Sequence, residues 1–415
     1  MVAGVMVLMA AGAWAEGAGR VCDAKTFGAK GDGVTKDTVA IQAAIDACAG
    51  KGGTARLTAG TYLSAPIMLK SGTTLKLEKG ATLLGSSDMK DYPAKTEFRT
   101  PGLQALVSAT NATDVTITGE GTIDGAGEPW WAAARTVKNA GVMGVNPRPR
   151  LVVFDHCKHV VVEGVTIQNS PMWQVVPYYS DDVTIRNVKI LAPPHSPNTD
   201  AIDPFSSSHV RIAHVLADVG DDDVAIKSGA IGSPGPDDPS TDITITDCTF
   251  LHGHGLSVGS EIAGGARNIV AERISFDGTD NGIRVKANRD RGNDVGNLVF
   301  RDITMKNVKN AVIVSEYYPK VLPAEGETAQ AMTRLTPHFH DIVIENMTAT
   351  GSDVAGAIVG LPESPVKNIM LKNVKIVAQK GMTIGYADVT ADGLSVEAAD
   401  GKGIELVEGG KVTAK

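Results

Sequence analysis

Three adjacent carboxylates stand immediately before an apolar run in the segment GDDDVAIKSG, residues 220–229. A charged neighbour together with partial burial raises the pKa of one carboxyl group above that of another, so such groups can divide acid and base roles. Asp200 lies upstream of this segment, and His254 lies downstream between two glycines. The set is typical of glycoside hydrolysis, in which a carboxylic acid protonates the leaving oxygen and a carboxylate activates water.

A basic pair follows these acidic residues. Arg284 and Lys286 are two positions apart, so both side chains point to the same side of a β-strand. Together they can bind a carboxylate or phosphate group of a substrate. The formal net charge of −8 argues against nucleic acid as a partner, because nucleic acid attracts positive surfaces. An anionic ligand must therefore be met by local basic residues, and an acidic sugar suits the whole set.

A short pattern recurs along most of the chain: a polar residue, alternating apolar positions, a polar or glycine step, and a second alternating run. It starts at Asp114, His159, Asp182, His209, Asp242, Asn268, Asn297, Asp341 and Asn368. From His159 onward the starts are separated by 23, 27, 33, 26, 29, 44 and 27 residues. Short strands at this spacing, without helical periodicity between them, indicate a β-solenoid, since the blades of a β-propeller need about forty or more residues each. We predict an all-β chain folded as a single right-handed parallel β-helix.

Stacked coils place equivalent positions in rows along the axis. Asp200, Asp221, His254, Arg284 and Tyr317 each fall in the second half of their own repeat. We therefore expect five successive coils to present one polar face.

The acidic segment itself conflicts with simple alternation. Val224 and Ile226 should point into the coil, and strict period two would send Asp222 inward with them. A turn or bulge over Gly220–Asp222 is needed before Asp221 and Asp222 can face the same groove.

The open ends of a β-helix are unpaired strand edges that must be covered. In the segment Asp37–Ala49, Asp37 can cap a helix, and Ile41, Ile45 and Cys48 fall on one helical face. We predict a short helix that covers the N-terminal end of the stack.

Three insertions bear on the shape of the groove. Two are long, Pro129–Arg150 and Tyr317–Phe339, and a shorter one, Ala230–Thr241, lengthens the turn after the acidic segment. Long loops on a repeat scaffold are usually functional rims or disordered insertions. Because neither long insertion breaks the repeat, we expect one catalytic domain over residues 16–415.

The first twenty residues, MVAGVMVLMAAGAWAEGAGR, have an apolar core too short to span a bilayer and contain a small-x-small pattern at Ala13–Ala15. We predict a signal peptide over residues 1–15 and a secreted or periplasmic protein; an apolar N-terminus of a cytosolic protein is the alternative. No later segment is long and apolar enough to be a membrane anchor, and we expect a monomer.

The four cysteines show no CxxC pairing, which argues against a zinc site. A disulfide between Cys22 and Cys48 is plausible in an exported chain. Cys157 and Cys248 lie inside apolar strand patterns, so we expect them to be buried thiols.

Four short motifs occur in order along the chain: NTD at Asn198–Asp200, GDD at Gly220–Asp222, GHG at Gly253–Gly255 and RVK at Arg284–Lys286. Each is weak alone. In this order on consecutive coils they resemble the signature motifs of glycoside hydrolase family 28, the polygalacturonases. The segments GTIDGAGEPWW and NSPMW resemble the surrounding family sequence, and the likeness covers nearly the whole mature chain.

The resemblance implies an inverting hydrolase of α-1,4-linked galacturonic acid, with no metal or other cofactor. Relatives that act on rhamnogalacturonan need not bind an acid at the same subsites, so the presence of His254, Arg284 and Lys286 favours homogalacturonan as the substrate over rhamnogalacturonan. It implies that Asp221 is the general acid and that Asp200 with Asp222 holds and activates the water. His254 would support the acid and bind substrate. Asn198 would contribute hydrogen bonds to the substrate or to a carboxylate.

The resemblance also implies a binding site for the sugar next to the cleaved bond. Arg284 and Lys286 would hold its carboxylate, and a tyrosine after the RVK motif would stack on the ring. Tyr317 is the candidate by spacing, with Tyr318 as its alternative. Asp203 and Asp223 are interpreted as structural or supporting residues.

Two other functions fit the same architecture. A pectate-type lyase would use calcium held by carboxylates, and three adjacent aspartates can be interpreted as such a site, although the GHG and RVK motifs have no obvious place in it. A non-catalytic carbohydrate-binding solenoid is the other alternative. Within the hydrolases, the long insertions near Trp130 and after Tyr317 favour cleavage from the chain end over internal cleavage.

Overall fold

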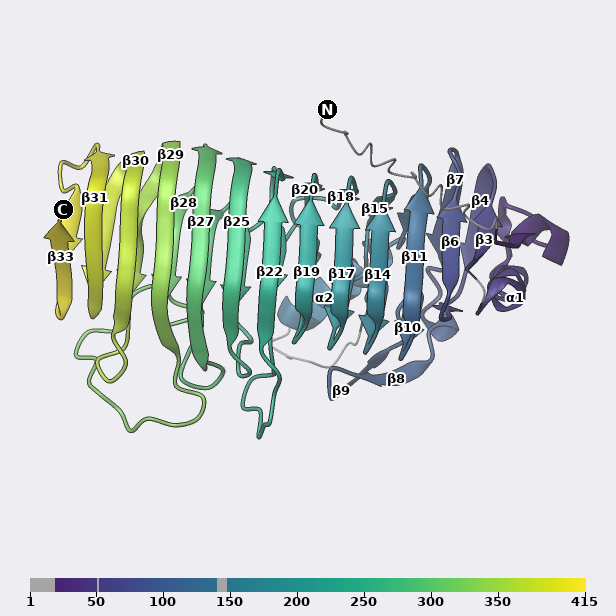
Figure 1. Cartoon of the computed structure of the whole chain (residues 1–415), viewed down its shortest axis with the longest axis horizontal. Coiled ribbons are helices and arrows are strands. Elements are labelled where there is room, and N and C mark those ends of the chain that lie inside the picture. Colours follow the sequence, from purple (N-terminus) through teal and green to yellow (C-terminus); the bar gives the residue numbers. More distant parts are fainter. Residues whose placement is uncertain (1–18, 51, 140–147) are drawn as a thin grey trace, which may run out of the picture.

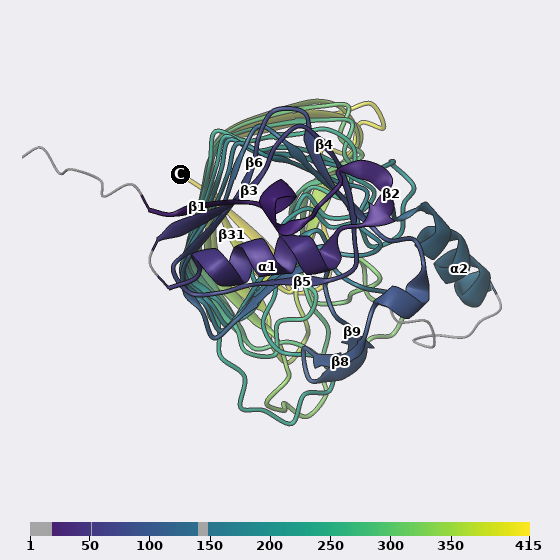
Figure 2. The same ribbon diagram turned by 90° about the vertical axis from the view of Figure 1, so that its right-hand side faces the viewer.

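The computed structural model describes residues 19–50, 52–139 and 148–415. These residues wind into a long stack of coils, seen from the side in Figure 1 and along the axis in Figure 2. Equivalent strands of successive coils pair in parallel, for example β14 (Lys158–Glu163) with β17 (Asp181–Arg186). The predicted parallel β-helix is confirmed. The predicted signal peptide lies outside the described residues.

The strands form three ladders, which we call A, B and C. Ladder A contains β1 (Val21–Asp23), β3 (Gly53–Leu57), β6 (Thr73–Leu77), β11 (Thr113–Gly119), β14, β17, β19 (Ser208–Ala213), β22 (Ser240–Thr246), β25 (Ala266–Asp277), β27 (Asp294–Lys306), β29 (His338–Val359), β30 (Val366–Gly385), β31 (Ala387–Ala398) and β33 (Gly410–Ala414). Ladder B contains β2 (Asp32–Lys36), β4 (Gly60–Ser64), β7 (Ala81–Gly85), β12 (Thr122–Asp124), β15 (Thr166–Gln168), β18 (Lys189–Leu191), β20 (Leu216–Asp218), β23 (Thr249–Phe250) and the second halves of β25 and β27.

Ladder C carries the candidate site. It contains β5 (Ile67–Leu69), β10 (Val107–Thr110), β13 (Val152–Asp155), β16 (Val175–Tyr178), β21 (Val224–Ile226), β24 (Leu256–Gly259), β26 (Asn281–Lys286), β28 (Asn310–Ser315), the last segments of β29 and β30, and β32 (Ile404–Leu406). Isolated bridges at Ile202 and Phe205 continue the ladder between β16 and β21.

Alternating side chains of each strand fill one continuous core. Val160, Val183 and Val210 pair across three coils and are fully buried. Burying such a side chain contributes about 1.5–3 kcal/mol. A single coil cannot bury its apolar side chains alone, so these side chains require that successive coils stack on one another.

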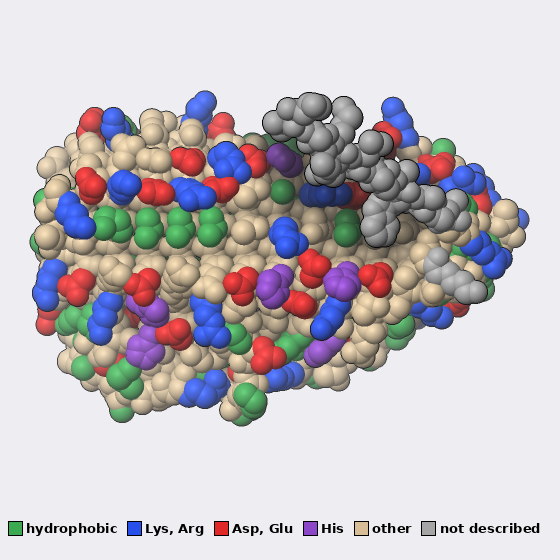
Figure 3. Space-filling view, in the orientation of Figure 1, with side chains coloured by type: hydrophobic (Ala, Val, Ile, Leu, Met, Phe, Trp, Pro, Cys, Tyr) green, Lys and Arg blue, Asp and Glu red, His purple; other side chains and the backbone are tan. Residues whose placement is uncertain are grey.

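The polar residue that begins each repeat has a backbone role. All nine starting residues have φ between 51° and 58°, the left-handed region that Asn, Asp and His tolerate better than most side chains. They bend the chain near the start of each ladder A strand. Their side chains face solvent and pair along the axis, as His209 does with Asp181 at 2.7 Å, and rows of charged side chains run along this face in Figure 3.

A helix covers the N-terminal end of the stack, as predicted. Helix α1 spans Thr38–Cys48 and buries Ile41, Ile45 and Cys48. Figure 2 shows it lying across the end of the coils. Asp37 precedes the helix, but its carboxylate accepts hydrogen bonds from the backbone N–H groups of the preceding loop, at Lys30 and Gly31, and does not cap the helix.

Cysteine chemistry follows the prediction. Cys22 and Cys48 form a disulfide that ties β1 to the end of α1, while Cys157 and Cys248 are buried free thiols. Among the described residues, no helix is both long and apolar enough to cross a lipid bilayer.

Several segments pack outside the coils. Helix α2 (Glu128–Asn139) was not predicted; it buries Trp130 edge-on against Tyr92, and Trp131 donates from Nε1 to the Ser170 carbonyl oxygen. An antiparallel hairpin of β8 (Ala94–Glu97) and β9 (Thr100–Leu103) was not predicted either. This hairpin, the turn over residues 230–239 and the loop over residues 320–337 lie on the same side of the stack in Figure 1.

Candidate active site

The site lies on the outward face of ladder C, where successive coils contribute one polar segment each. Asp200 precedes the bridge at Ile202, the acidic segment precedes β21, and His254 precedes β24. Arg284 and Lys286 alternate with the buried Ile283 and Val285 on β26 and therefore point outward. The expected gathering of these residues from separate repeats is present in the structure.

The acidic segment changes direction before its strand begins. Residues 220–223 lie outside any strand, and β21 starts at Val224. Asp222 therefore escapes the alternation that buries Val224 and Ile226 in the core. This is the predicted turn, and it lets Asp221 and Asp222 approach the same groove.

Asp222 is held on both sides of its carboxylate. Its side chain is buried; Oδ1 accepts a hydrogen bond from Ser257 Oγ at 2.7 Å, and Oδ2 accepts one from Lys286 Nζ at 2.6 Å. Arg284 Nη1 lies 4.0 Å from Oδ1. In the free protein, Lys286 is therefore an ion-pair partner of Asp222.

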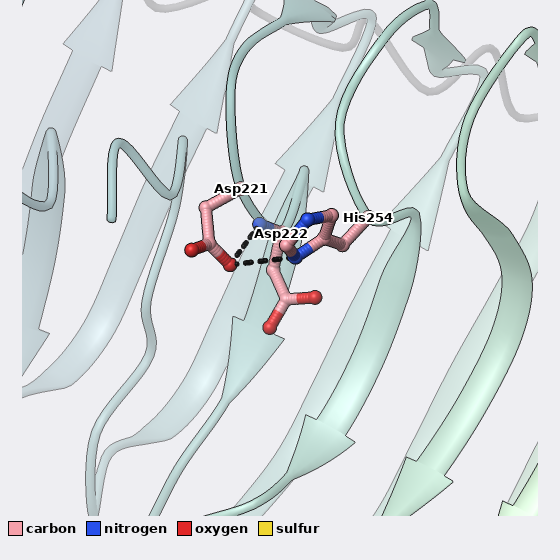
Figure 4. A group of neighbouring side chains, drawn as sticks. All are labelled: Asp221, Asp222 and His254. Atoms are coloured by element: carbon pink, nitrogen blue, oxygen red, sulfur yellow. Dashed lines mark hydrogen bonds and ion pairs between the residues drawn. The ribbon is translucent and has the colours of Figure 1, made fainter. Parts of the chain in front are cut away.

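Asp221 pairs with His254, as Figure 4 shows. His254 Nδ1 lies 3.0 Å from Asp221 Oδ1, and its Nε2 lies 3.5 Å from Asp280. Burial opposes ionisation of Asp221, but the hydrogen bond and charge of His254, with the charge of Lys286, hold the pKa of Asp221 well below its usual range. Burial also lowers the pKa of His254, but Asp221 outweighs burial and raises it. Both shifts favour the ionic form of the pair.

The pKa of Asp200 is shifted in the opposite direction to that of Asp221. Its side chain is buried, and burial together with the charges of Asp221 and Asp203 raises the pKa of Asp200 well above its usual range. The free protein thus holds a proton on Asp200 more readily than on Asp221. The general-acid role that the resemblance implies for Asp221 requires the opposite distribution, with the proton on Asp221.

Lys227 forms an ion pair with Asp200. Lys227 Nζ lies 3.7 Å from Asp200 Oδ2 and 3.3 Å from Glu261 Oε2. It also lies 4.9 Å from the centroid of the Trp173 ring. Sequence reasoning did not single out Lys227, although its place one residue after the inward-facing Ile226 signals that it faces outward.

Asp223 has a structural role in the turn. Its Oδ2 accepts a hydrogen bond from the backbone N–H of Gly255 at 3.0 Å, and its own N–H donates to the carbonyl oxygen of Gly255 at 2.9 Å. Burial raises the pKa of Asp223 and of Asp203 well above the usual range. Asp223 therefore joins the acidic turn to the segment that carries His254.

The tyrosine beside the basic pair is Tyr318 and not the expected Tyr317. Tyr317 is buried against aliphatic residues of the next coils, including Val359 and Leu361. The Tyr318 ring lies 5.5 Å from the Arg284 guanidinium carbon and 5.4 Å from Lys286 Nζ.

The end of β28 explains this correction. The chain leaves the strand after Ser315, and the backbone N–H of Tyr318 donates to the carbonyl oxygen of Ala287 at 2.9 Å. Asn288 Nδ2 donates to the carbonyl oxygen of Tyr318 at 2.7 Å. These bonds fix Tyr318 beside the end of β26, whereas residue spacing alone does not reveal which of two neighbouring tyrosines faces the groove.

Asn198 is oriented by an arginine that sequence reasoning missed. Arg148 donates to Asn198 Oδ1 at 2.7 Å and to the carbonyl oxygens of Pro171 and Pro197. Because guanidinium only donates, the amide Nδ2 of Asn198 turns toward Asp221 Oδ2, at 3.5 Å. Asn198 therefore lies within the site and can serve as a donor.

The acidic cluster is a poor fit for a divalent cation. Ligand atoms of Asp221, Asp222 and His254 lie within 4.8 Å of one another. However, both Asp222 oxygens already accept hydrogen bonds, one from the ammonium of Lys286, and Asp221 pairs with His254. Calcium prefers several oxygen ligands without competing cations, so the donor set does not favour the calcium site of a lyase.

The chain matches one protein family over most of its length. The family model for glycosyl hydrolases family 28 matches residues 50–393. The chain is 31% identical over 409 residues to an endo-polygalacturonase from Pectobacterium parmentieri, covering 93% of this chain and 96% of that relative.

Two solved structures share the fold at similar identity. A hyperthermoactive exopolygalacturonase from Thermotoga maritima has a TM-score of 0.78 and 29% identity, and the match covers 91% of each chain. A polygalacturonase from Erwinia carotovora ssp. carotovora has a TM-score of 0.76 and 28% identity, covering 89% of this chain and 96% of that chain. The relatives thus include both an endo- and an exo-enzyme.

Proposed function

Because the chain belongs to the glycosyl hydrolases family 28, we propose that it hydrolyses the α-1,4-galacturonosidic bonds of homogalacturonan with inversion. The observation that carries the substrate class is the pair of cations, Arg284 and Lys286, beside the carboxylate cluster and under the Tyr318 ring. This arrangement suits a sugar that carries a carboxylate. The Arg284 side chain is 15% exposed, so its guanidinium borders the groove.

In this mechanism Asp221 donates a proton to the leaving oxygen, and Asp200 with Asp222 orients and deprotonates the attacking water. His254 donates a hydrogen bond to Asp221 and holds it in place, and Asn198 contacts the other Asp221 oxygen. Arg284 and Lys286 bind the galacturonate carboxylate, and Tyr318 packs on the ring.

Substrate binding supplies the protonation state that the free protein lacks. The charge of Lys286 contributes to the low pKa of Asp221, and a galacturonate carboxylate bound to Lys286 offsets that charge. Exclusion of water by the sugar disfavours the ionised carboxylate further. In the complex, Asp221 then carries the proton and acts as the acid, whereas Asp200 is ionised and acts as the base.

Cleavage from the chain end is supported by the β8–β9 hairpin. Phe98 at its tip is buried against Val153, Val176, Tyr178 and Phe205, which line the outward face of ladder C in the coils before the acidic segment. A polymer can be cut internally only if the groove is open at both ends. A hairpin packed on the outward face of ladder C limits how far the polymer extends past the site.

The hairpin is joined to the site by packed side chains. Glu97 pairs with Arg150 at 2.9 Å, and the Arg150 guanidinium carbon lies 3.9 Å from the Phe98 centroid and 4.5 Å from the Trp173 centroid. Trp173 in turn contacts Lys227, the neighbour of Asp200.

Export to the periplasm or the medium is part of the proposal. The signal-like first fifteen residues support it, and so does the Cys22–Cys48 disulfide, because disulfides persist in oxidising compartments. A monomeric state stays a prediction, which light scattering of the purified protein tests.

Product analysis on polygalacturonate tests the proposal. Monomer in the first minutes indicates end cleavage, a ladder of oligomers indicates internal cleavage, and no product refutes the substrate assignment. Asp221→Asn provides the control; loss of the general acid should lower kcat by about 10²- to 10⁴-fold. A variant with unchanged kcat would refute the role of Asp221.

A further inference from the structure

Three segments far apart in the sequence meet at one buried carboxylate. Asp237, in the turn over residues 230–239, has a side chain that is 2% exposed. Its Oδ2 accepts a hydrogen bond from Ser233 Oγ at 2.6 Å, and its Oδ1 lies 2.9 Å from Arg99 Nη1. Arg334 Nη1 lies 3.7 Å from Oδ2. We call this set, Asp237 with Ser233, Arg99 and Arg334, the Asp237 clasp.

Arg99 attaches the β8–β9 hairpin to the clasp. Its Nη2 donates to the carbonyl oxygen of Pro236 and to Tyr179 Oη, both at 3.2 Å. Arg99 stands at the hairpin tip beside Phe98, which packs on ladder C. The arginine therefore joins the tip to the turn that follows β21, the strand of the acidic segment.

Arg334 attaches the loop over residues 320–337. It donates to the carbonyl oxygens of Ser233 and Ala263. This loop follows Tyr318, so the clasp connects the hairpin on the N-terminal side of the acidic segment with the loop on its C-terminal side. The three segments lie on that side in Figure 1 and also in the axial view of Figure 2.

The hairpin tip is strained in a way that requires support. Phe98 and Arg99 have φ values of 52° and 61°. A two-residue turn with both residues in the left-handed region normally carries Asn or Gly, and bulky side chains there persist only where the surrounding structure holds them. Phe98 is held by the rings of Trp173, Tyr178 and Phe205, and Arg99 is held by Asp237.

We propose that Asp237 is a specificity-determining positioning residue: it holds the hairpin over the groove and thereby sets the length of the released products. The inference rests on the proposed function. Release of the clasp leaves the strained tip without one of its two anchors, so the hairpin lifts and polymer can pass beyond the site. The clasp touches no reacting group, and its loss changes where the polymer is cut more than whether it is cut.

The test compares Asp237→Asn and Arg99→Gln with the unmodified enzyme on polygalacturonate. The matched control is Asp238→Asn, since Asp238 is exposed in the same turn and its side chain makes no hydrogen bond or ion pair within the described part of the chain. The measurements are the ratio of oligomers to monomer in the first minutes and hydrogen exchange of residues 94–103.

We expect both clasp variants to raise the oligomer-to-monomer ratio by about tenfold, the factor that loss of about 1.4 kcal/mol of closure produces, with faster exchange in the hairpin. Asp238→Asn should match the parent in both. If Asp237→Asn fails to fold, Arg99→Gln carries the test, because it leaves the Asp237 bonds to Ser233 and Arg334 in place.

Two results distinguish a failure of the inference about Asp237 from a failure of the proposed function. If the parent enzyme releases only oligomers, end cleavage is refuted, and the clasp is judged by whether its variants lengthen those oligomers. If folded Asp237→Asn and Arg99→Gln keep the parent's product lengths, the inference about Asp237 is overturned whatever the mode of cleavage.

Discussion

Replacement of Glu261 by glutamine removes a charge that the structure couples to the site through Lys227. Glu261 is 27% exposed at its side chain and pairs with Lys227, which is 6% exposed. Burial opposes its ionisation, but the charge of Lys227 dominates and lowers the pKa of Glu261 from 4.5 to about 2. The ionised glutamate is therefore much better accommodated in the folded protein than in the unfolded chain.

The size of the effect follows from linkage. At about 1.36 kcal/mol for each pKa unit, this change corresponds to about 3 kcal/mol, and the net value of a charged hydrogen bond is about 1.5–3 kcal/mol. We expect Glu261→Gln to lower the free energy of unfolding by about 2–3 kcal/mol at pH 7. Because the folded pKa is lowered, this stabilisation is present above pH 4.5 and is lost as the pH falls towards about 2.

Urea unfolding of both proteins at a series of pH values between 7 and about 3 measures the difference. The gap should be largest at pH 7 and should shrink below pH 4.5, where Glu261 of the unfolded parent takes up a proton that the folded protein does not bind. Glu405→Gln is the matched control. Glu405 pairs with Lys402 at 3.5 Å, but these side chains are 52% and 63% exposed, so its loss should cost well under about 1 kcal/mol. A gap that is absent at pH 7, or that stays constant as the pH falls, would refute the coupling.

Three further predictions concern the frame and the groove. Replacing Cys22 and Cys48 by serine should lower the free energy of unfolding by about 3.5 kcal/mol, a value that follows from the 26-residue separation of the bridge. Urea unfolding with and without reductant measures this loss. If reductant still destabilised the variant that lacks both cysteines, the prediction would be contradicted. Tyr318→Ala should raise KM by about tenfold, because the substrate loses the ring face on which it packs. Tyr317→Ala should instead lower the free energy of unfolding by about 3 kcal/mol with little change in KM. The reverse pattern would show that Tyr317, and not Tyr318, contacts the substrate. Chelation of metal ions by EDTA should leave the rate of hydrolysis unchanged, because Asp222 is already paired with Lys286. Activity that EDTA abolishes and that only calcium restores would indicate a metal-dependent reaction.

Much of the architecture could be predicted because it repeats. The alternation of apolar and polar residues specifies which side chains point into the core. The left-handed backbone conformation at the start of each repeat favours the polar residue found there. Four of the segments that form the site could be aligned for the same reason, since equivalent positions in a stack share a row. The turn at Gly220 was predicted because Asp221 and Asp222 could not both face the groove without it.

The remaining features depend on contacts between distant residues. The Lys286–Asp222 pair spans 64 residues, and nothing in either motif shows that the lysine binds the protein's own carboxylate in the free state. The β8–β9 hairpin has the sequence AKTEFRTPGL, which lacks a clear alternating pattern; its shape is held by Phe98 on ladder C and by Arg99 on Asp237. Which of Tyr317 and Tyr318 faces the groove is decided by backbone bonds to Ala287 and Asn288.

The anomeric form of the first product tests the central claim most directly. Proton NMR of polygalacturonate digestion, recorded before mutarotation equilibrates the ends, identifies the configuration of each new reducing end. If Asp221 acts as acid and Asp200 with Asp222 activates water, the α-linkage is replaced directly and the β-anomer is formed first. Initial release of the α-anomer, or of unsaturated ends, would contradict the mechanism.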